Sequence, residues 1–116
     1  MQKFTEAIQM LGAETGIIKE KALKLYKLFF TMYVDTKAQV SEQIFRRDFT
    51  GLAKSAHQLK GACANLRFVD MYGLALKLEL AAKEEKIDLC QELLSLIDEQ
   101  YEDLLKGYQI AVNENA

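Results

Sequence analysis

The feature that most constrains this chain is its shortage of helix breakers. Its 116 residues include no proline, and its 6 glycines occur singly rather than in runs. Proline and clustered glycine interrupt helices more strongly than other residues. Apolar residues also recur at helical spacing along most of the chain. We therefore predict an all-α protein.

The apolar pattern divides the chain into one short and four longer helices. A short leading helix should end in a loop between Gly12 and Gly16. The next helices are predicted at about 19–46 and 49–65, with Asp48 as the N-cap of the second. The connections should lie at 67–70 and 83–88, with Asp88 as another candidate N-cap. The core stripes of the leading and the last two helices are Phe4, Ala7, Ile8 and Leu11; Met71, Leu74, Ala75, Leu78 and Ala82; and Cys90, Leu93, Leu94, Ile97, Tyr101, Leu104 and Tyr108.

Short connections between long helices favour antiparallel neighbours. The predicted architecture is an antiparallel up-down-up-down four-helix bundle with a short extra N-terminal helix. A chain of this length suits one domain, 1–116, with a bundle core at about 19–110. The tail at 113–116 should be frayed.

Two of the predicted helices are more apolar than a bundle requires. The residues concerned are Tyr26, Phe30 and Tyr33, which lie on a different side from Leu25, Phe29 and Met32, and Val69, Tyr72, Leu76 and Leu80, which oppose their helix's core stripe. The leading helix can cover part of this surplus. The rest forms either scattered exposed apolar side chains or a docking or self-association patch.

Composition excludes several classes of function. The formal net charge of −2 gives no basic footprint for nucleic acid. No apolar run is long enough for membrane insertion, and no signal segment begins the chain, so we expect a cytoplasmic protein. Cys63 and Cys90 fall on apolar stripes and match no zinc spacing, which predicts two buried free thiols.

The chain has one histidine, His57, within a segment that otherwise has the pattern of one amphipathic helix. The core stripe of that helix is Leu52, Ala56, Leu59, Cys63 and Leu66. At roughly 100° per residue, His57 points about 140° away from this stripe, toward solvent. Small side chains surround it at Ala53, Gly61 and Ala64, and lysines lie one turn away at Lys54 and Lys60. This arrangement indicates a site that another molecule must reach.

Gly61 and Lys60 strengthen the case for function at His57. Glycine inside a helix costs about 0.5 to 1 kcal/mol relative to alanine. At i+4 from His57, it leaves room for an incoming group beside the ring. Lys60 at i+3 can bring an ammonium group to phosphate oxygens, and a nearby cation favours the neutral imidazole that a nucleophile must be.

The run from His57 to Gly61, His-Gln-Leu-Lys-Gly, followed by Asn65-Leu66, resembles the signature of histidine phosphotransfer (HPt) domains of two-component phosphorelays. The resemblance covers about residues 20 to 105. It extends to further positions outside the motif: Phe29, Asp48, Met71, Leu74, Leu78 and Glu79.

The resemblance implies that His57 accepts a phosphoryl group from a receiver-domain aspartyl phosphate and passes it to another receiver. Lys60 would support the phosphoryl charge, Gln58 would give secondary polar support, and Gly61 would permit docking. The surrounding docking residues would be Ala53, Lys54 and Ala64. The partners would be response-regulator receivers, with a hybrid sensor histidine kinase as a further candidate, and the carrier a monomer or a weak homodimer. Mg²⁺ would belong to the receiver, leaving this chain without cofactor or metal.

Three positions depart from the family pattern. Arg67 stands where a glycine is usual, Cys63 where a small hydroxyl residue is common, and Ile87 where a glycine precedes the capping aspartate. We expect Arg67 to change the turn that follows the histidine helix without removing the phosphorylation site.

Other classes of function remain as alternatives. A di-iron bundle needs paired Glu-x-x-His motifs, and Glu79 is an inward-leaning carboxylate without a histidine on its own helix. An autonomous enzyme would need an acidic group to orient His57, and none lies within one turn. Because nothing resembles an ATP-binding domain, we expect a carrier and not a kinase. A binding-only adaptor, a degenerate HPt domain, stays open.

Overall fold

The computed structural model describes residues 2–115 as five α-helices, without a strand among them. They are α1 (Gln2–Thr15), α2 (Lys19–Arg46), α3 (Phe49–Leu66), α4 (Val69–Lys83) and α5 (Ile87–Asn115). The all-α prediction is confirmed. Within the described part of the chain, no helix is both long and apolar enough to cross a membrane.

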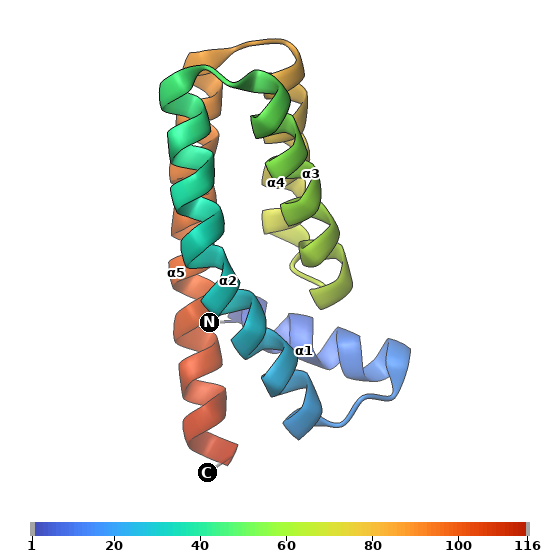
Figure 1. Ribbon diagram of the computed structural model, residues 1–116. Coiled ribbons are helices and arrows are strands. Elements are labelled where there is room, and N and C mark those ends of the chain that lie inside the picture. The colour runs from blue at the N-terminus through green and yellow to red at the C-terminus, as the bar shows by residue number, and fades with distance from the viewer. Residues whose placement is uncertain (1, 116) are drawn as a thin grey trace.

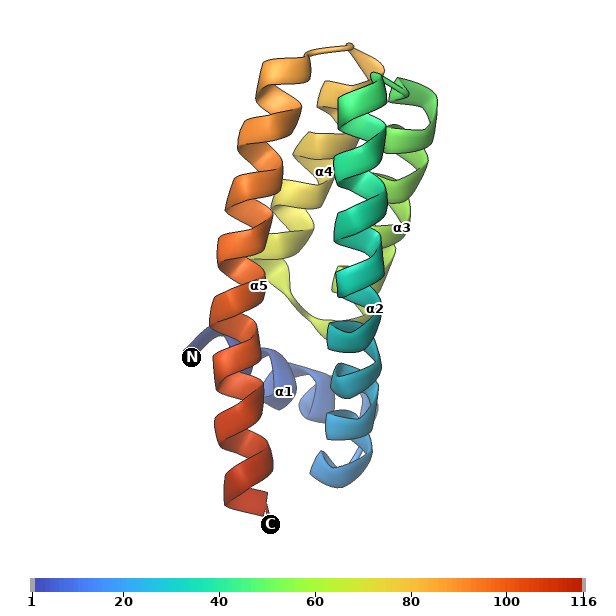
Figure 2. The ribbon, with the colours of Figure 1, turned by 60° about the vertical axis from the view of Figure 1, so that its left-hand side comes forward.

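The four longer segments of the chain run side by side, and α1 crosses one end of them. Each of α2, α3 and α4 packs against the next helix, and α2 also packs against α5. The chain direction alternates from α2 to α5, as the colour change along each helix shows (Figures 1 and 2). The helix α1 lies across the lower parts of α2 and α5 (Figure 2) and contacts both. The helix α1 packs mainly against α5 and α2 and only slightly against α3.

Helix boundaries differ from the predictions at four places. Gly12 lies inside α1, and the helix ends before Gly16, whose φ of 76° only glycine adopts without strain. Residues 69 and 70 begin α4 and are not part of a connection. Asp88 lies in the first turn of α5 and is not its N-cap. The tail predicted to fray is helical to Asn115, and Ala116 lies outside the described residues.

Aromatic packing explains which side of α2 is buried. Phe4 from α1 is 1% exposed, and its ring centroid lies 4.9 Å from that of Tyr26 and 6.0 Å from that of Tyr108 on α5. These contacts bring α1 into the core, as expected of a helix covering surplus apolar residues. All four central aromatic residues of α2 are buried, including Phe29, whereas Leu25 and Met32 are 43% and 61% exposed.

Both cysteines are buried and free, as predicted. Burial raises the pKa of the Cys63 thiol to about 12, which keeps it protonated and unreactive near neutral pH. Cys63 packs within the core stripe of α3. Its side chain is buried and does not reach the exposed face of α3.

Candidate functional site

Helix α3 presents the candidate site, and both of its ends are anchored. Asp48 is its N-cap, because its carboxylate accepts a hydrogen bond of 3.0 Å from the backbone N–H of Gly51. This confirms the predicted cap. At the other end, the buried Tyr26 hydroxyl donates to the carbonyl of Leu66 at 2.9 Å. The rotation of α3 about its axis is therefore well defined, and with it the direction of His57.

His57 is exposed, as predicted, with 64% of its side chain accessible to solvent. Its Nδ1 lies 2.9 Å from Oε2 of Glu79, a residue of α4. No acidic residue lies within one turn of His57 on its own helix, so the periodicity of α3 carried no signal for this contact. The orienting carboxylate is supplied by the neighbouring helix.

Glu79 is the buried centre of a cluster of cations. Its side chain is 8% exposed, and Oε1 accepts a hydrogen bond of 2.8 Å from Nζ of Lys60. Nζ of Lys83 lies 3.5 Å from Oε2, the same oxygen that His57 contacts. The hydrogen bond from Lys60 is the main cause that lowers the pKa of Glu79 to about 2; burial opposes it and His57 adds to it. Glu79 is therefore a carboxylate at any physiological pH.

The charge on Glu79 determines which ring nitrogen of His57 is available. A carboxylate only accepts hydrogen bonds, so Nδ1 must carry the proton that it shares with Oε2. In the neutral ring, Nε2 then holds the free lone pair. Among residues 2–115, no group hydrogen-bonds to Nε2. The site therefore holds an exposed nucleophilic ring whose tautomer is fixed by the carboxylate of Glu79 on the neighbouring helix.

Lys60 makes its hydrogen bond to Glu79, and its predicted support of a phosphoryl group stays a prediction. Its side chain is 19% exposed, and its ammonium points at Glu79. The sequence predicted its reach toward His57 but not the buried carboxylate that holds it.

Gly61 has the open surroundings that were predicted. A Cβ added there would meet no atom within 4 Å other than those of its own helix backbone and chain neighbours. Ala64 and Lys54 are also exposed, and Ala53 is half-buried. Small side chains and open space therefore do surround the exposed ring, with nothing inside the described chain that requires a glycine at 61.

Gln58 does not hydrogen-bond to His57 within the described chain. It lies at the edge of a groove between α2 and α3, which Met32 and Ala62 also line. The groove volume is about 80 Å³, far below the roughly 300 to 1,000 Å³ of small-molecule pockets. The groove beside Gln58 is therefore too small for a typical small-molecule ligand.

Arg67 does not change the turn in the way that was expected. Its φ of 64° and ψ of 31° place it in the left-handed conformation that glycine favours at a helix C-terminus. The backbone N–H of Phe68 bonds to the carbonyl of Cys63 at 2.9 Å, which closes the turn. The side chain compensates for the strain, since its Nε donates to Glu14 of α1 at 2.8 Å.

The neighbours of Glu79 differ from those of a di-iron carboxylate. Among residues 2–115, no three His, Cys, Asp or Glu side chains are placed to hold an ion together. Glu79 does have a histidine partner, but on the neighbouring helix, and its remaining contacts are to lysines. Lysine ammonium groups repel a metal cation.

A comparison with family models identifies the chain. The model of the Hpt domain matches residues 24–107, which include His57 and all of α3 and α4. The chain belongs to the Hpt domain family. The Hpt domain is a helical, histidine-containing phosphotransfer module of phosphorelays and a phosphocarrier rather than a kinase. Searches of the curated proteins and of the solved structures gave no match.

Proposed function

We propose that His57 is the phosphorylation site of this Hpt domain. It would accept a phosphoryl group from the aspartyl phosphate of one receiver domain and pass it to an aspartate of another. The observation that carries this proposal is the exposed ring whose Nδ1 is engaged by the buried carboxylate of Glu79. With Nδ1 engaged, Nε2 is the ring nitrogen left for the phosphoryl group, on a side chain that is 64% exposed.

The proposed step needs no acid or base from this chain. The lone pair of Nε2 attacks phosphorus while the P–O bond to the donor aspartate breaks, and the aspartate leaves with that electron pair as a carboxylate. Nδ1 keeps its proton, so the ring gains a positive charge. The carboxylate of Glu79, 2.9 Å from Nδ1, stabilises that charge. The reverse step on an acceptor aspartate restores the neutral ring.

As membership of the Hpt domain family implies, the receiver would supply Mg²⁺ and the remaining catalytic groups, and this chain would supply the nucleophile His57. We propose that the receiver covers α3 around Gly61 and extends onto α2. The apolar side chains of Leu25, Leu28 and Met32 are 43%, 61% and 61% exposed on α2. Burying such residues at an interface is favourable at about 25 cal/mol per Å² of apolar surface.

In this proposal α2–α5 form the antiparallel up-down-up-down bundle, and α1 is the extra N-terminal helix that closes its end. The protein would act in the cytoplasm as a carrier without catalysis of its own. Gln58 would contact the receiver from the rim of the α2–α3 groove, not the ring of His57.

Phosphotransfer profiling tests the proposal. The protein is incubated with a panel of receiver domains, each carrying radioactive phosphate, beside a His57→Gln variant whose helicity is matched by circular dichroism. The wild type should acquire acid-labile, base-stable label from at least one receiver, and the variant none. Equal label in the variant would show that the site is elsewhere. If no receiver labels the wild type, the chain is a binding-only module.

A further inference from the structure

Two lysines share the carboxylate of Glu79, and they are held very differently. Lys60 comes from α3 and is 19% exposed, with its Nζ 2.8 Å from Oε1. Lys83 comes from the last turn of α4 and is 60% exposed, with its Nζ 3.5 Å from Oε2. Ammonium–carboxylate hydrogen bonds are usually about 2.7 to 2.9 Å long. Lys60 therefore makes a full hydrogen bond, whereas Lys83 makes only a loose, solvated ion pair.

Lys60 is poorly placed to leave Glu79. Its departure would deprive a buried carboxylate of its strongest partner, and an uncompensated buried charge is costly. The movement would also weaken the support that Glu79 gives to Nδ1 of His57. Lys60 therefore holds the carboxylate of Glu79 in place, and Glu79 in turn orients the ring of His57.

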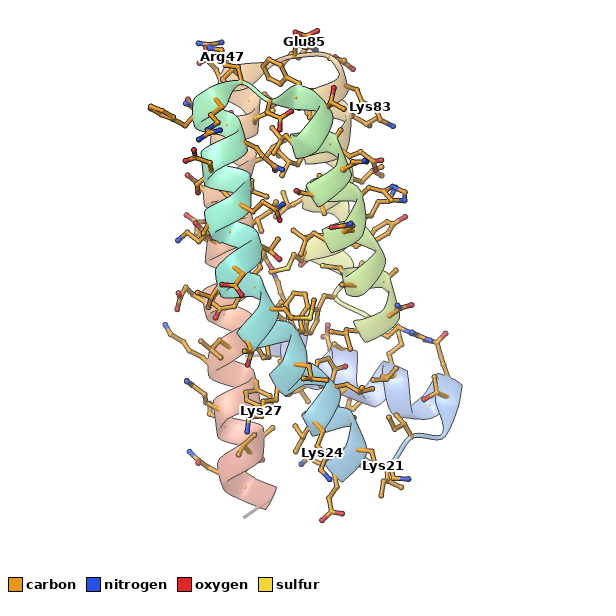
Figure 3. The ribbon with its side chains drawn as sticks, in the orientation of Figure 1. Lys21, Lys24, Lys27, Arg47, Lys83 and Glu85 are labelled. Atoms are coloured by element: carbon orange, nitrogen blue, oxygen red, sulfur yellow. The ribbon has the colours of Figure 1, made fainter. Side chains whose placement is uncertain are left out.

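Lys83 has the opposite properties. It approaches Oε2, the oxygen that also contacts Nδ1, so it lies on the His57 side of Glu79. Figure 3 shows Lys83 near the end of α4, at the top of the view. It lies far from Lys21, Lys24 and Lys27, which are in the lower, N-terminal part of α2. Its exposed four-carbon stem is free to turn. Releasing it costs little, because Lys60 still neutralises Glu79.

We propose that Lys83 is the cation that binds the phosphoryl group on His57, by moving from Glu79 to a phosphoryl oxygen. This inference rests on the proposed phosphorylation of His57. The new group brings up to two negative charges to Nε2, whereas the carboxylate that Lys83 leaves carries one and keeps Lys60. Lys60 acts as a positioning residue, and Lys83 contacts the phosphoryl group. This assignment differs from the one that the motif implies, in which Lys60 is the residue that contacts the phosphoryl group.

Nuclear magnetic resonance can observe the exchange of partners directly. The protein is phosphorylated with phosphoramidate, and the side-chain CεH₂ signals of its lysines are followed. The signal of Lys83 should shift on phosphorylation while that of Lys60 stays in place. A shift of Lys60 or Lys54 with Lys83 unmoved would overturn the assignment.

Equilibrium phosphotransfer gives a second readout with matched variants. The ratio of phosphorylated to unphosphorylated protein is measured in exchange with a receiver that labels His57. Lys83→Met should lower this ratio about two- to five-fold, the range expected for an exposed ion pair, and Lys83→Arg should restore it. Lys27→Met, an exposed lysine at the far end of α2 (Figure 3), is the control. Equal ratios for Lys83→Met and Lys27→Met would refute the role of Lys83 alone, whereas a wild type that takes no phosphate would refute the proposed function as well.

Discussion

Replacing Glu79 by glutamine tests whether one carboxylate holds the site together. Glutamine has nearly the same shape, but it offers one acceptor oxygen where the carboxylate offers two. If that oxygen stays with Nδ1 of His57, the amide NH₂ faces the ammonium of Lys60. Glu79→Gln should therefore leave a largely buried ammonium without its acceptor while the helices keep their packing.

The expected loss of stability follows from the two lysine contacts. The bond to Lys60 is 2.8 Å long and joins side chains that are 19% and 8% exposed. A hydrogen bond to a charged group contributes about 1.5 to 3 kcal/mol. The looser pair with Lys83, which is 60% exposed, adds at most a few tenths of a kcal/mol, on the order expected at a surface. A loss of about 2 kcal/mol at pH 7 would lower the melting temperature by roughly 6 to 12 °C in a domain of this size.

The loss should also depend on pH with a definite sign. The pKa of Glu79 is lowered from 4.5 to about 2 in the folded protein. A carboxyl group with a depressed folded pKa stabilises the fold above its unfolded pKa, and this contribution disappears as pH falls through the folded value. The stability difference between wild type and Glu79→Gln should be complete above about pH 5 and should shrink steadily toward pH 2.

Urea denaturation followed by far-ultraviolet circular dichroism at pH 7, 5, 4 and 3 measures this difference. The other carboxyl groups titrate in both proteins, so their contributions cancel in the stability difference. Glu92→Gln is the control, because Glu92 is exposed on α5 and has no ion pair within residues 2–115; it should change stability by less than about 0.5 kcal/mol. A Glu79→Gln effect as small as the control, or one that stays constant from pH 7 to 3, would refute the pairing of Glu79 with Lys60.

Further predictions concern backbone positions and are checked by the same denaturation assay. Gly51→Ala should destabilise the protein by about 0.5 to 1 kcal/mol despite the better helix propensity of alanine, because its Cβ would collide with the carboxylate of Asp48 and break the N-cap. Gly61→Ala, with nothing near the added Cβ, should instead stabilise it by about 0.5 to 1 kcal/mol; a shift of both variants in the same direction would contradict the cap explanation. Arg47→Gly should stabilise the protein by about 0.5 to 1 kcal/mol, since Arg47 ends α2 with a φ of 55°, and a destabilised variant would show that its side chain matters more than its backbone.

The features of the site that could be predicted from the sequence are those that depend on residues of one helix only. Exposure of His57 and the open space at Gly61 follow from positions on α3, because a helix sets the angle between residues three and four apart. The same holds for the N-cap at Asp48. The final placement of Lys60 could not be predicted in this way, since its stem can turn toward either solvent or the neighbouring helix.

Glu79 shows where such local reasoning ends. The sequence identifies it as a carboxylate at the edge of the α4 core stripe, with Lys83 one turn later. These two features were the available signal for a buried ion pair. To identify His57 and Lys60 as the partners of Glu79, one must know how α4 is rotated about its axis and shifted along it relative to α3. The apolar periodicity of α4 does not give either quantity.

That register is set by the short turn between α3 and α4. Arg67 and Phe68 are its two residues, and its geometry is held by the left-handed backbone of Arg67 and by the bond from the Tyr26 hydroxyl to the end of α3. One additional residue inside α4, ahead of Glu79, would rotate the Glu79 side chain by about 100° about the helix axis relative to the start of α4. This rotation would carry the carboxylate away from Nδ1 of His57. The ring would then be free to take either tautomer. Two chains with the same motif from His57 to Gly61 would therefore differ in whether the tautomer of the ring is fixed, if only one of them brings a carboxylate of the neighbouring helix to Nδ1.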